Sequence, residues 1–477
     1  MTHEATAISK EFPKGLEIEY CFECGICTAG CPIARVMPQY YNPRITLQSI
    51  FFNLNKAITE NKIWLCAWCD RCRERCPQKL NIPEILMSAR NAAIESGFLK
   101  NFGEALELIG KEIPFPGVLG LVCLSRVDDP QSHEALKHII ADYVLRKSSE
   151  KVTPIRKKHS KKVAVIGSGP AGLMAAYELV MLGYPVTVFD SLSEPGGMFR
   201  WGIPEHRLPR EVLDAEIKHI MKIGVKIKTN THIGKDLTLD ELLRERYKAI
   251  FIATGAHKSI HLGIEGEGLK GVIYALEFLK NAKLENHFEL VQKAAVIGGG
   301  NVAIDVARTL LRLGLKSVNI LYRRSREEMP ANSFEVKQAE IEGVNFHFLV
   351  TPKKILGKDG RATAVECSRM KLGEPDESGR RRPIPMDGSE FITETDMVIL
   401  AIGETPDLSF LPEGIEVSKN TIVVDPVTLE TSMPGIFAGG DVVLGPASVS
   451  EAIASGKRAA YYIDLFLQRQ SKNQKRG

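Results

Sequence analysis

Residues 162–190 read KVAVIGSGPAGLMAAYELVMLGYPVTVFD. Within them, the apolar run Val163–Ile166 predicts a buried parallel strand, which a glycine-rich turn connects to a helix with apolar periodicity. A second apolar strand, Val186–Phe189, ends at Asp190, 23 residues after Gly167. Strand, turn, helix, strand and terminal acid in this order predict a dinucleotide-binding α/β unit of the Rossmann type.

Each position of the turn has a physical role in such a unit. Gly167 permits the tight turn, Gly169 lets the backbone approach a pyrophosphate, and Gly172 lets the helix and the strand pack closely. The helix N-terminus offers free N–H groups and a positive dipole end to the phosphates. Asp190 can accept hydrogen bonds from a ribose diol. The residues predicted to bind this nucleotide are Gly167, Gly169, Pro170, Ala171, Gly172 and Asp190.

Two later segments resemble the further FAD motifs of two-dinucleotide flavoproteins. They are AIFIATGA at residues 249–256 and GIFAGGD at residues 435–441. The resemblance implies that the first nucleotide is FAD. It also implies that the helix after Ala447 directs its N-terminus at the flavin, where the helix dipole favours the anionic reduced form. The residues it places at the FAD site are Thr254, Gly255, Gly440, Asp441, Ser448 and Val449.

Eight of the ten cysteines fall into two runs with the same spacing, C-x2-C-x2-C-x3-C-P. This is the ligand pattern of [4Fe–4S] proteins, because thiolates are soft ligands and the close spacing wraps one loop around a cluster. Zinc would favour two separated C-x2-C pairs. In two-cluster ferredoxins the fourth cysteine of each run ligates the other cluster. The predicted ligand sets are Cys21, Cys24, Cys27 and Cys76 for one cluster, and Cys31, Cys66, Cys69 and Cys72 for the other.

The segments around the cysteines are helix-like, which predicts a helical two-cluster module. Residues 17–100 resemble the heterodisulfide reductase C family, in the cysteine runs and in the helix-like segment that follows them. Three aromatic residues, Phe22, Trp64 and Trp68, stand beside the cysteines, and we expect them to shield the clusters from water.

A second Rossmann unit begins at Ala294, with AAVIGGGNVAIDVARTLL. Its turn has the pattern GxGxxA, and the strand that follows ends in Tyr322-Arg323-Arg324 without an acid for a free 2′-hydroxyl. A guanidinium there suits the 2′-phosphate of NADP(H), which favours NADP(H) over NAD(H). The residues predicted to bind it are Gly298, Gly300, Asn301, Ala303, Arg323 and Arg324.

The segment at residues 196–209, GGMFRWGIPEHRLP, resembles the small (β) subunit of glutamate synthase. Together with its flanking motifs, the resemblance covers about residues 155–470. In that family the segment lies along the FAD, which adds Gly197 and Arg200 to the implied site, and a matching Tyr-Arg-Arg is found there too. The resemblance implies hydride transfer between cofactors, which requires positioning rather than a catalytic acid or base, so no catalytic side chain is predicted.

The expected fold is an α/β two-dinucleotide-binding flavoprotein with an N-terminal all-α ferredoxin domain. We expect residues 1–150 to form the two-cluster domain, residues 155–288 and 400–470 the FAD domain, and residues 289–399 an inserted NADP(H) domain. We expect the strand at Val398 to return the chain to the FAD domain, and residues 371–391 to form a surface hairpin.

Composition and charge limit the classes of function and the cellular compartments that fit this chain. Charged residues make up 25% of the 477 residues and the net charge is +4, which gives no support for nucleic-acid binding. The sequence has no run of about 18 apolar residues for a membrane span and no apolar signal-peptide core at its start. Cysteines grouped as metal ligands indicate a reducing compartment, so we expect a cytoplasmic protein.

We therefore expect an NAD(P)H-dependent FAD and iron–sulfur oxidoreductase. Hydride would pass from NADPH to FAD, and single electrons would pass through two [4Fe–4S] clusters to or from a partner protein. The partner would be a glutamate synthase-like large subunit, a heterodisulfide reductase B-like subunit or a ferredoxin, in a hetero-oligomer. The alternatives are a stand-alone NADPH:ferredoxin reductase, a flavin-based bifurcating subunit, and an electron-relay subunit with a decayed nucleotide site, against which the intact second glycine turn argues.

Overall fold

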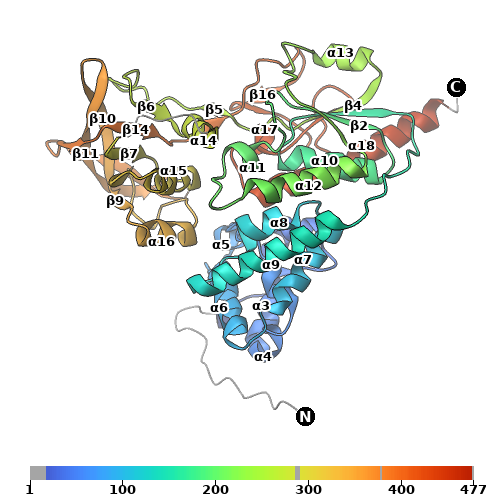
Figure 1. Ribbon diagram of the computed structural model, residues 1–477, viewed down its shortest axis with the longest axis horizontal. Helices are drawn as coiled ribbons and strands as arrows, with labels where there is room; N and C mark the ends of the chain where they lie inside the picture. The colour runs from blue at the N-terminus through green and yellow to red at the C-terminus, as the bar shows by residue number, and fades with distance from the viewer. Residues whose placement is uncertain (1–17, 285–290, 377–378, 475–477) are drawn as a thin grey trace. The chain divides into compact units, whose positions relative to one another are not determined.

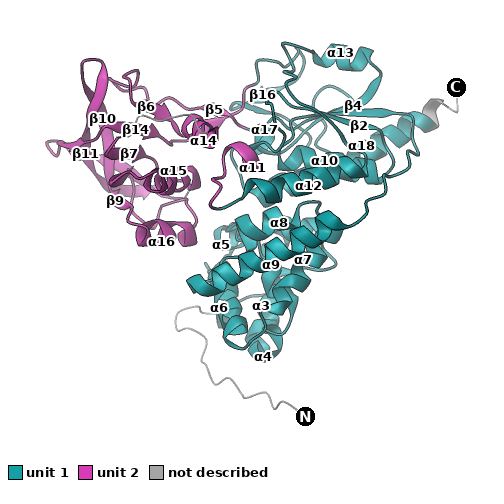
Figure 2. Cartoon of the chain, viewed as in Figure 1, with its two compact units in different colours: residues 1–197, 207–255, 408–477 teal, residues 198–206, 256–407 magenta. Residues whose placement is uncertain are grey.

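The computed structural model describes residues 18–284, 291–376 and 379–474 (Figure 1). The chain divides into two compact units (Figure 2). Unit 1 comprises residues 1–197, 207–255 and 408–477, and unit 2 comprises residues 198–206 and 256–407. Among the helices that the structure describes, none has both the length and the apolar character needed to cross a membrane.

Residues 18–149 of unit 1 form only helices and their connections. Local signals start several of them: the Asn42 side chain accepts from the Ile45 N–H at 3.3 Å with Pro43 in the first position, and Asp129 caps the last helix in the same way. Buried Trp64, Phe102 and Leu136 contribute to their core. The elements are η1 (Ile18–Tyr20), α1 (Ile26–Gly30), α2 (Pro32–Val36), α3 (Pro43–Phe52), α4 (Leu54–Ala57), η2 (Asn61–Leu65), α5 (Arg71–Arg75), α6 (Ile82–Glu95), α7 (Lys100–Glu112), α8 (Pro116–Leu119), η3 (Gly120–Leu124) and α9 (Pro130–Ser149).

The rest of unit 1 is built on a five-stranded parallel sheet of order β18-β4-β1-β2-β3. Its central strands are buried along almost their whole length, as expected of a parallel sheet covered on both faces. The strands are β1 (Lys162–Ile166), β2 (Val186–Phe189), β3 (Lys226–Lys228), β4 (Tyr247–Ile252) and β18 (Ile436–Ala438). The helices are α10 (Pro170–Met181), α12 (Arg210–Ile223), α13 (Leu239–Arg244), α17 (Asp441–Leu444) and α18 (Val449–Gln474), and a small ladder joins β16 (Val417–Ser418) to β17 (Thr421–Ile422).

Unit 2 contains a second five-stranded parallel sheet, of order β6-β14-β7-β8-β9. Its strands are β6 (Val272–Tyr274), β7 (Lys293–Ile297), β8 (Ser317–Tyr322), β9 (Asn345–Phe348) and β14 (Met397–Leu400), with helices α11 (Met198–Trp201), α14 (Ala275–Lys283), α15 (Asn301–Arg312) and α16 (Ser333–Ile341). An antiparallel sheet adds β10 (Val350–Lys358), β11 (Arg361–Pro375), β12 (Arg381–Pro385) and β13 (Phe391–Glu394). The short strands β5 (Lys258–Ser259) and β15 (Glu404–Thr405) pair where the chain enters and leaves unit 2.

The boundaries of the inserted domain differ from those expected. Strand β14 does not return the chain to the first sheet: it lies between β6 and β7 in the second sheet, where Val398 pairs with Val272 of β6 and with Ala295 of β7. The strand β6 and the helix α14, which we expected in the FAD domain, therefore belong to unit 2, as does α11. The hairpin expected at residues 371–391 is present, between β11 and β12.

Candidate cofactor sites

The first glycine turn has the close backbone contacts that its sequence predicts. Gly167 has φ +99°, and a Cβ atom on it would lie 2.4 Å from the carbonyl oxygen of Ala253. A Cβ atom on Gly172 would lie 2.0 Å from the carbonyl oxygen of Gly167. Gly197, with φ +53°, approaches in the same way, since its Cβ would lie 2.6 Å from the Gly169 Cα. A side chain at these positions would push the turn apart.

Asp190 holds this turn in place. Its Oδ2 atom accepts the Ser168 N–H at 2.9 Å and also the Ser168 hydroxyl, and its Oδ1 atom accepts the Leu192 N–H at 2.9 Å. The Ser168 hydroxyl oxygen in turn accepts the Gly196 N–H at 3.0 Å. The acid at the end of β2 is thus buried and fixes the turn after β1, so its predicted bond to a ribose would come in addition to these.

Two further loops meet at the same sheet edge. Strands β1, β4 and β18 are parallel neighbours, so the loops that follow them lie together at their carboxyl ends. The Thr254 Oγ1 atom is buried and has no hydrogen-bond partner among the described residues. Gly255 and Gly440 have φ +72° and +73°. An unpaired buried hydroxyl beside backbone in a conformation that favours glycine fits a polar ligand, so these residues are compatible with a bound dinucleotide.

Helix α18 begins beside this edge. The Ser448 hydroxyl accepts the Glu451 N–H at 3.3 Å, and the Glu451 carboxylate accepts the Ser448 N–H at 3.1 Å, which forms a reciprocal cap. The predicted ligand Ser448 therefore uses its side chain within the cap, and Val449 is the first helical residue. Gly456 of α18 packs on α10, where a Cβ atom would lie 2.2 Å from the Ala171 carbonyl oxygen. The helix that follows the first glycine turn is thereby held against α18.

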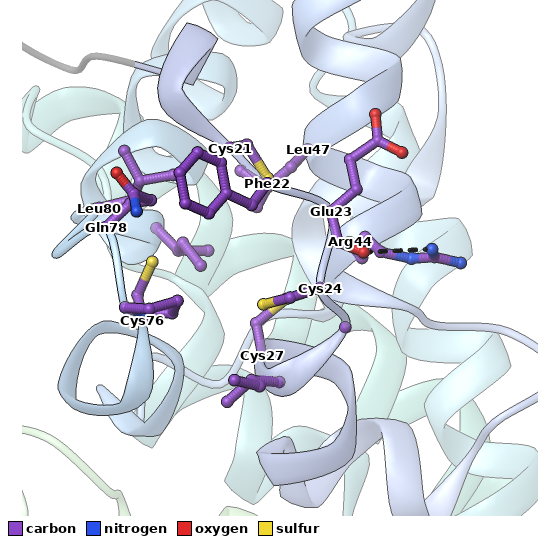
Figure 3. Close-up of a pocket in the computed structure, with 14 residues that line it drawn as sticks. Cys21, Phe22, Glu23, Cys24, Cys27, Arg44, Leu47, Cys76, Gln78 and Leu80 are labelled. Carbon is purple, nitrogen blue, oxygen red and sulfur yellow. Dashed lines mark hydrogen bonds between the residues drawn. The ribbon is translucent and has the colours of Figure 1, made fainter.

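The first predicted cysteine set surrounds one pocket. Cys21, Cys24, Cys27 and Cys76 all line it, and Cys76 comes from the other cysteine run (Figure 3). Apolar side chains of Leu47, Leu80 and Ile82 form much of the remaining wall. Cys24 is exposed, so this set lies near the surface. Phe22 also lines the pocket but is 70% exposed, and the expected shielding role does not hold for it.

The second predicted set is more deeply buried. Burial, and after it the negative charge of the neighbouring Cys66, raise the pKa of the Cys31 thiol to about 12. The pKa of Cys72 is also raised, first by burial and then by Cys66, Cys69 and Cys31. Backbone N–H groups of Ala34 and Trp68 donate to the sulfurs of Cys31 and Cys66, both at 3.4 Å. These four sulfurs are close enough to repel one another as thiolates, a cost that a bound metal core would remove.

The two cysteine loops repeat one backbone conformation 45 residues apart. Glu23 and Trp68, each two residues after the first cysteine of its run, have φ +54° and +50°. Gly25 and Asp70, two residues further on, have φ +77° and +58°, and the five-residue helices α1 and α5 follow. The helices α1 and α5 that follow the two loops are also in contact, which brings each fourth cysteine towards the other run. No group of three His, Cys, Asp or Glu side chains in the described ranges converges as a site for a single metal ion.

Two residues that the sequence analysis missed contact the second set. Tyr41 is 2% exposed, and its burial, together with the neighbouring Cys66, raises the pKa of its hydroxyl. Arg90 is fully buried on α6, and its Nη2 atom donates to the Cys66 carbonyl oxygen at 2.8 Å. The helical spacing offered a signal for Arg90, because it lies on the face of α6 that also carries the buried Leu86 and Ala93.

The second glycine turn, in unit 2, leaves room for a ligand. Gly298 has φ +145°, and a Cβ atom there would lie 2.1 Å from the Ala401 carbonyl oxygen. Gly300, in contrast, has no atom within 4 Å of such a Cβ. The Asn301 Oδ1 atom accepts the Asn332 N–H at 2.9 Å, and Ala303 is fully buried. The turn is closely packed at Gly298, beside the end of β14, and has free space at Gly300, where a pyrophosphate would approach the backbone.

The two arginines after β8 differ, and Arg324 does not fit its predicted role. Arg323 is exposed, whereas Arg324 is 4% exposed. The Arg324 Nη2 atom pairs with Asp376 at 2.5 Å, and its Nε atom donates to the Arg381 carbonyl oxygen at 2.8 Å. Arg324 thus anchors the β11–β12 hairpin, and only Arg323 of the pair keeps its guanidinium exposed to a 2′-phosphate.

Residues 161–456 match the family of pyridine nucleotide-disulphide oxidoreductases, and residues 17–80 match the 4Fe-4S dicluster domain. The chain is 45% identical over 432 residues to the NADP(+)-dependent formate dehydrogenase subunit beta of Moorella thermoacetica (83% of this chain, 60% of the relative). It is 41% identical over 435 residues to the NADPH-Fe(3+) oxidoreductase subunit beta of Geobacter sulfurreducens (83% and 63%). The chain thus spans less than two thirds of the length of these two relatives.

The small chain of the NADPH glutamate synthase of Escherichia coli is 39% identical over 322 residues, which cover 64% of this chain and 68% of the relative. The FprA structure from Mycobacterium tuberculosis in complex with NADPH superposes with a TM-score of 0.58 at 21% identity, over 66% of this chain and 86% of FprA. These matches confirm the predicted resemblance to glutamate synthase small subunits and the predicted fold class.

Proposed function

The chain belongs to the pyridine nucleotide-disulphide oxidoreductase family, together with the small chains of glutamate synthase, and we propose that it is the NADPH-dependent electron-transfer subunit of a larger enzyme. In this proposal unit 1 binds FAD at its sheet edge and two [4Fe–4S] clusters at its cysteine sets, while unit 2 binds NADP(H) at its glycine turn. Electrons from NADPH leave the chain one at a time for a partner protein, or enter by the same route in reverse.

One contact carries the proposal. Arg71, which lies between Cys69 and Cys72, donates from its Nε atom to the Glu451 carboxylate at 2.7 Å. Glu451 is in the first turn of α18, beside the loops that fit a dinucleotide. The Arg71–Glu451 pair therefore joins the second cysteine set to the edge of the first nucleotide site, within unit 1.

The contact also indicates the order in which electrons would pass through the two cysteine sets. The set of Cys31, Cys66, Cys69 and Cys72 lies on the side of α18, and the set that includes the exposed Cys24 lies at the surface. FAD, when bound, would supply the exchange between a two-electron hydride and single electrons. The residues of this chain hold the turn through Asp190, cap α18 through Ser448 and Glu451, and exclude water from the inner cysteine set.

Two relatives support a separate partner. Both are named as beta subunits and both names include NADP or NADPH, but one is a formate dehydrogenase and the other an Fe(3+) oxidoreductase. The two relatives share a region that is similar to this chain, although their names give different reactions. This is what we expect of a common NADPH-dependent module whose partner protein determines the substrate. We therefore place this chain in a hetero-oligomer, with its outer cysteine set facing the partner.

An anaerobic titration of the purified chain tests the proposal. NADPH, and separately NADH, is added while flavin absorbance and low-temperature EPR are recorded. We expect NADPH to bleach the flavin first and reduced-cluster EPR signals to follow, with NADH less effective. Cys76→Ser and Cys31→Ser should each remove one cluster, so that iron and acid-labile sulfide fall by about half in both variants. A flavin that NADPH does not bleach, or iron that remains at the level of one cluster in the wild type, would refute the proposal.

A further inference from the structure

Arg90 has an unusual position for an arginine. Its side chain is completely buried, and its guanidinium donates to three backbone carbonyl oxygens. Nε donates to Ile63 at 3.0 Å, Nη1 to Leu124 at 3.1 Å and Nη2 to Cys66 at 2.8 Å. The guanidinium carbon also lies 5.5 Å from the centre of the Trp64 ring. The side chain is therefore well bonded, but none of these partners carries a negative charge.

A buried guanidinium remains protonated, so its charge requires compensation. Among the described residues, no Asp or Glu carboxylate forms an ion pair with Arg90. The titratable groups that act on it are Cys66, Tyr41, Arg126 and Cys123, and Arg126 adds a second positive charge nearby. A [4Fe–4S] cluster bound by the cysteine set that contains Cys66, whose carbonyl oxygen Arg90 contacts, would supply a negative charge beside the guanidinium.

We propose that Arg90 is the counter-charge of the [4Fe–4S] cluster at Cys31, Cys66, Cys69 and Cys72, and that it raises the reduction potential of this cluster. The inference rests on the proposed function, because it requires a cluster at these residues. A cluster with four thiolate ligands carries net negative charge, and reduction by one electron adds one more unit without a change of ligands. A fixed positive charge in a poorly solvated site favours the reduced form.

The outer cysteine set has no equivalent among the described residues that line its pocket. The one arginine there, Arg44, is only partly buried and donates to the Glu23 carbonyl oxygen at 3.5 Å. Water screens a charge there far more than at Arg90. The two sets thus differ in the buried charge beside them, and the inner cluster is expected to be the one whose potential depends on an arginine.

The test is a potentiometric titration of the complete, cluster-loaded chain, with dithionite as reductant and EPR as readout. Arg90→Gln removes the charge but keeps N–H donors for the carbonyl groups, and Arg90→Lys keeps the charge but loses the planar fork. The matched control is Arg35→Gln, because Arg35 is exposed and also bonds a backbone carbonyl, that of Ala29, at 2.8 Å. Signals are assigned with Cys76→Ser, which should retain only the inner cluster.

At the wild-type midpoint of the inner cluster, we expect the ratio of reduced to oxidised cluster to fall at least tenfold in Arg90→Gln, which is about 59 mV for one electron. The outer cluster should not change, and Arg90→Lys and Arg35→Gln should stay close to the wild type. An unchanged inner potential in Arg90→Gln, or an equal fall in Arg90→Lys, would overturn the inference while leaving the proposed function intact. A wild-type chain without any [4Fe–4S] EPR signal would overturn both.

Discussion

The Glu216 carboxylate, on α12, accepts the backbone N–H of Gly117 at 2.6 Å. Its second oxygen accepts the N–H of Val118 at 3.0 Å, so one buried acid caps the first turn of α8. Gly117 is required there, since a Cβ atom would lie 2.3 Å from a Val144 methyl carbon and 2.9 Å from the Glu216 oxygen. The helical part of unit 1 is thus attached to the sheet part by a buried carboxyl group whose oxygens accept two backbone N–H groups.

This attachment should depend on pH. Burial raises the pKa of Glu216 to about 8, against an ordinary value of 4.5. Between these two values the folded chain holds a proton that the unfolded chain has lost, so stability falls as the pH rises towards and through 8. From pH 6 to pH 9 this group should remove about 2–3 kcal/mol. Thermal unfolding at both pH values should show a smaller pH-dependent loss in Glu216→Gln than in the wild type.

The control for that measurement is Glu211→Gln, because Glu211 lies on the same helix and is exposed. Its pH dependence should match the wild type. If Glu216→Gln loses as much stability between pH 6 and pH 9 as the wild type does, Glu216 is ionised throughout this range in the folded chain and the assignment is wrong.

The Arg71–Glu451 pair should matter more for electron transfer than for stability. Its side chains are 34% and 18% exposed, and such a pair contributes about 1 kcal/mol or less. Arg71→Gln should therefore fold normally, but it removes a contact that holds the inner cysteine set against α18. We expect flavin reduction by NADPH at the wild-type rate, followed by several-fold slower appearance of reduced-cluster signals in rapid-freeze EPR. Lys137→Gln, which breaks the exposed Lys137–Glu134 pair on α9, is the control and should change neither step.

Local sequence patterns predicted the glycine turns and the grouping of the cysteines, whereas the features that they did not predict depend on contacts between distant residues. The glycine turns follow from local spacing, because neighbouring residues determine these loops. The placement of Cys76 with the cysteines of the first run was predicted from the ligand pattern of two-cluster ferredoxins. Arg324 could not be assigned in this way, since its partner Asp376 is 52 residues away and reaches it only when the hairpin folds back. Strand β14 is a four-residue apolar run that suits either parallel sheet, so its sequence does not indicate which one it joins.

Substitutions at two glycines of the second glycine turn should have different effects, one on thermal stability and the other on nucleotide binding. Gly298→Ala should lower the thermal stability, because the Cβ atom would collide with the Ala401 carbonyl group in a backbone conformation that alanine avoids. Gly300→Ala should leave stability within about 0.5 kcal/mol, because nothing lies within 4 Å of its Cβ. It should nevertheless raise KM for NADPH, since the methyl group occupies space that the pyrophosphate needs. Equal KM values for Gly300→Ala and the wild type would show that the nucleotide does not approach this turn.

Substitutions of the adjacent arginines Arg323 and Arg324 should likewise differ, one affecting nucleotide binding and the other stability. Arg323 is exposed, so Arg323→Ala should unfold like the wild type while KM for NADPH rises about 10- to 100-fold, which corresponds to the loss of a charge-assisted hydrogen bond to the 2′-phosphate. KM for NADH should change little, because NADH has no such phosphate. Arg324→Met removes one partner of a mostly buried ion pair and should lower the unfolding free energy by about 2–4 kcal/mol. If Arg323→Ala raises KM for both nucleotides equally, this arginine holds the turn rather than the phosphate, and the preference for NADP(H) must arise elsewhere in unit 2.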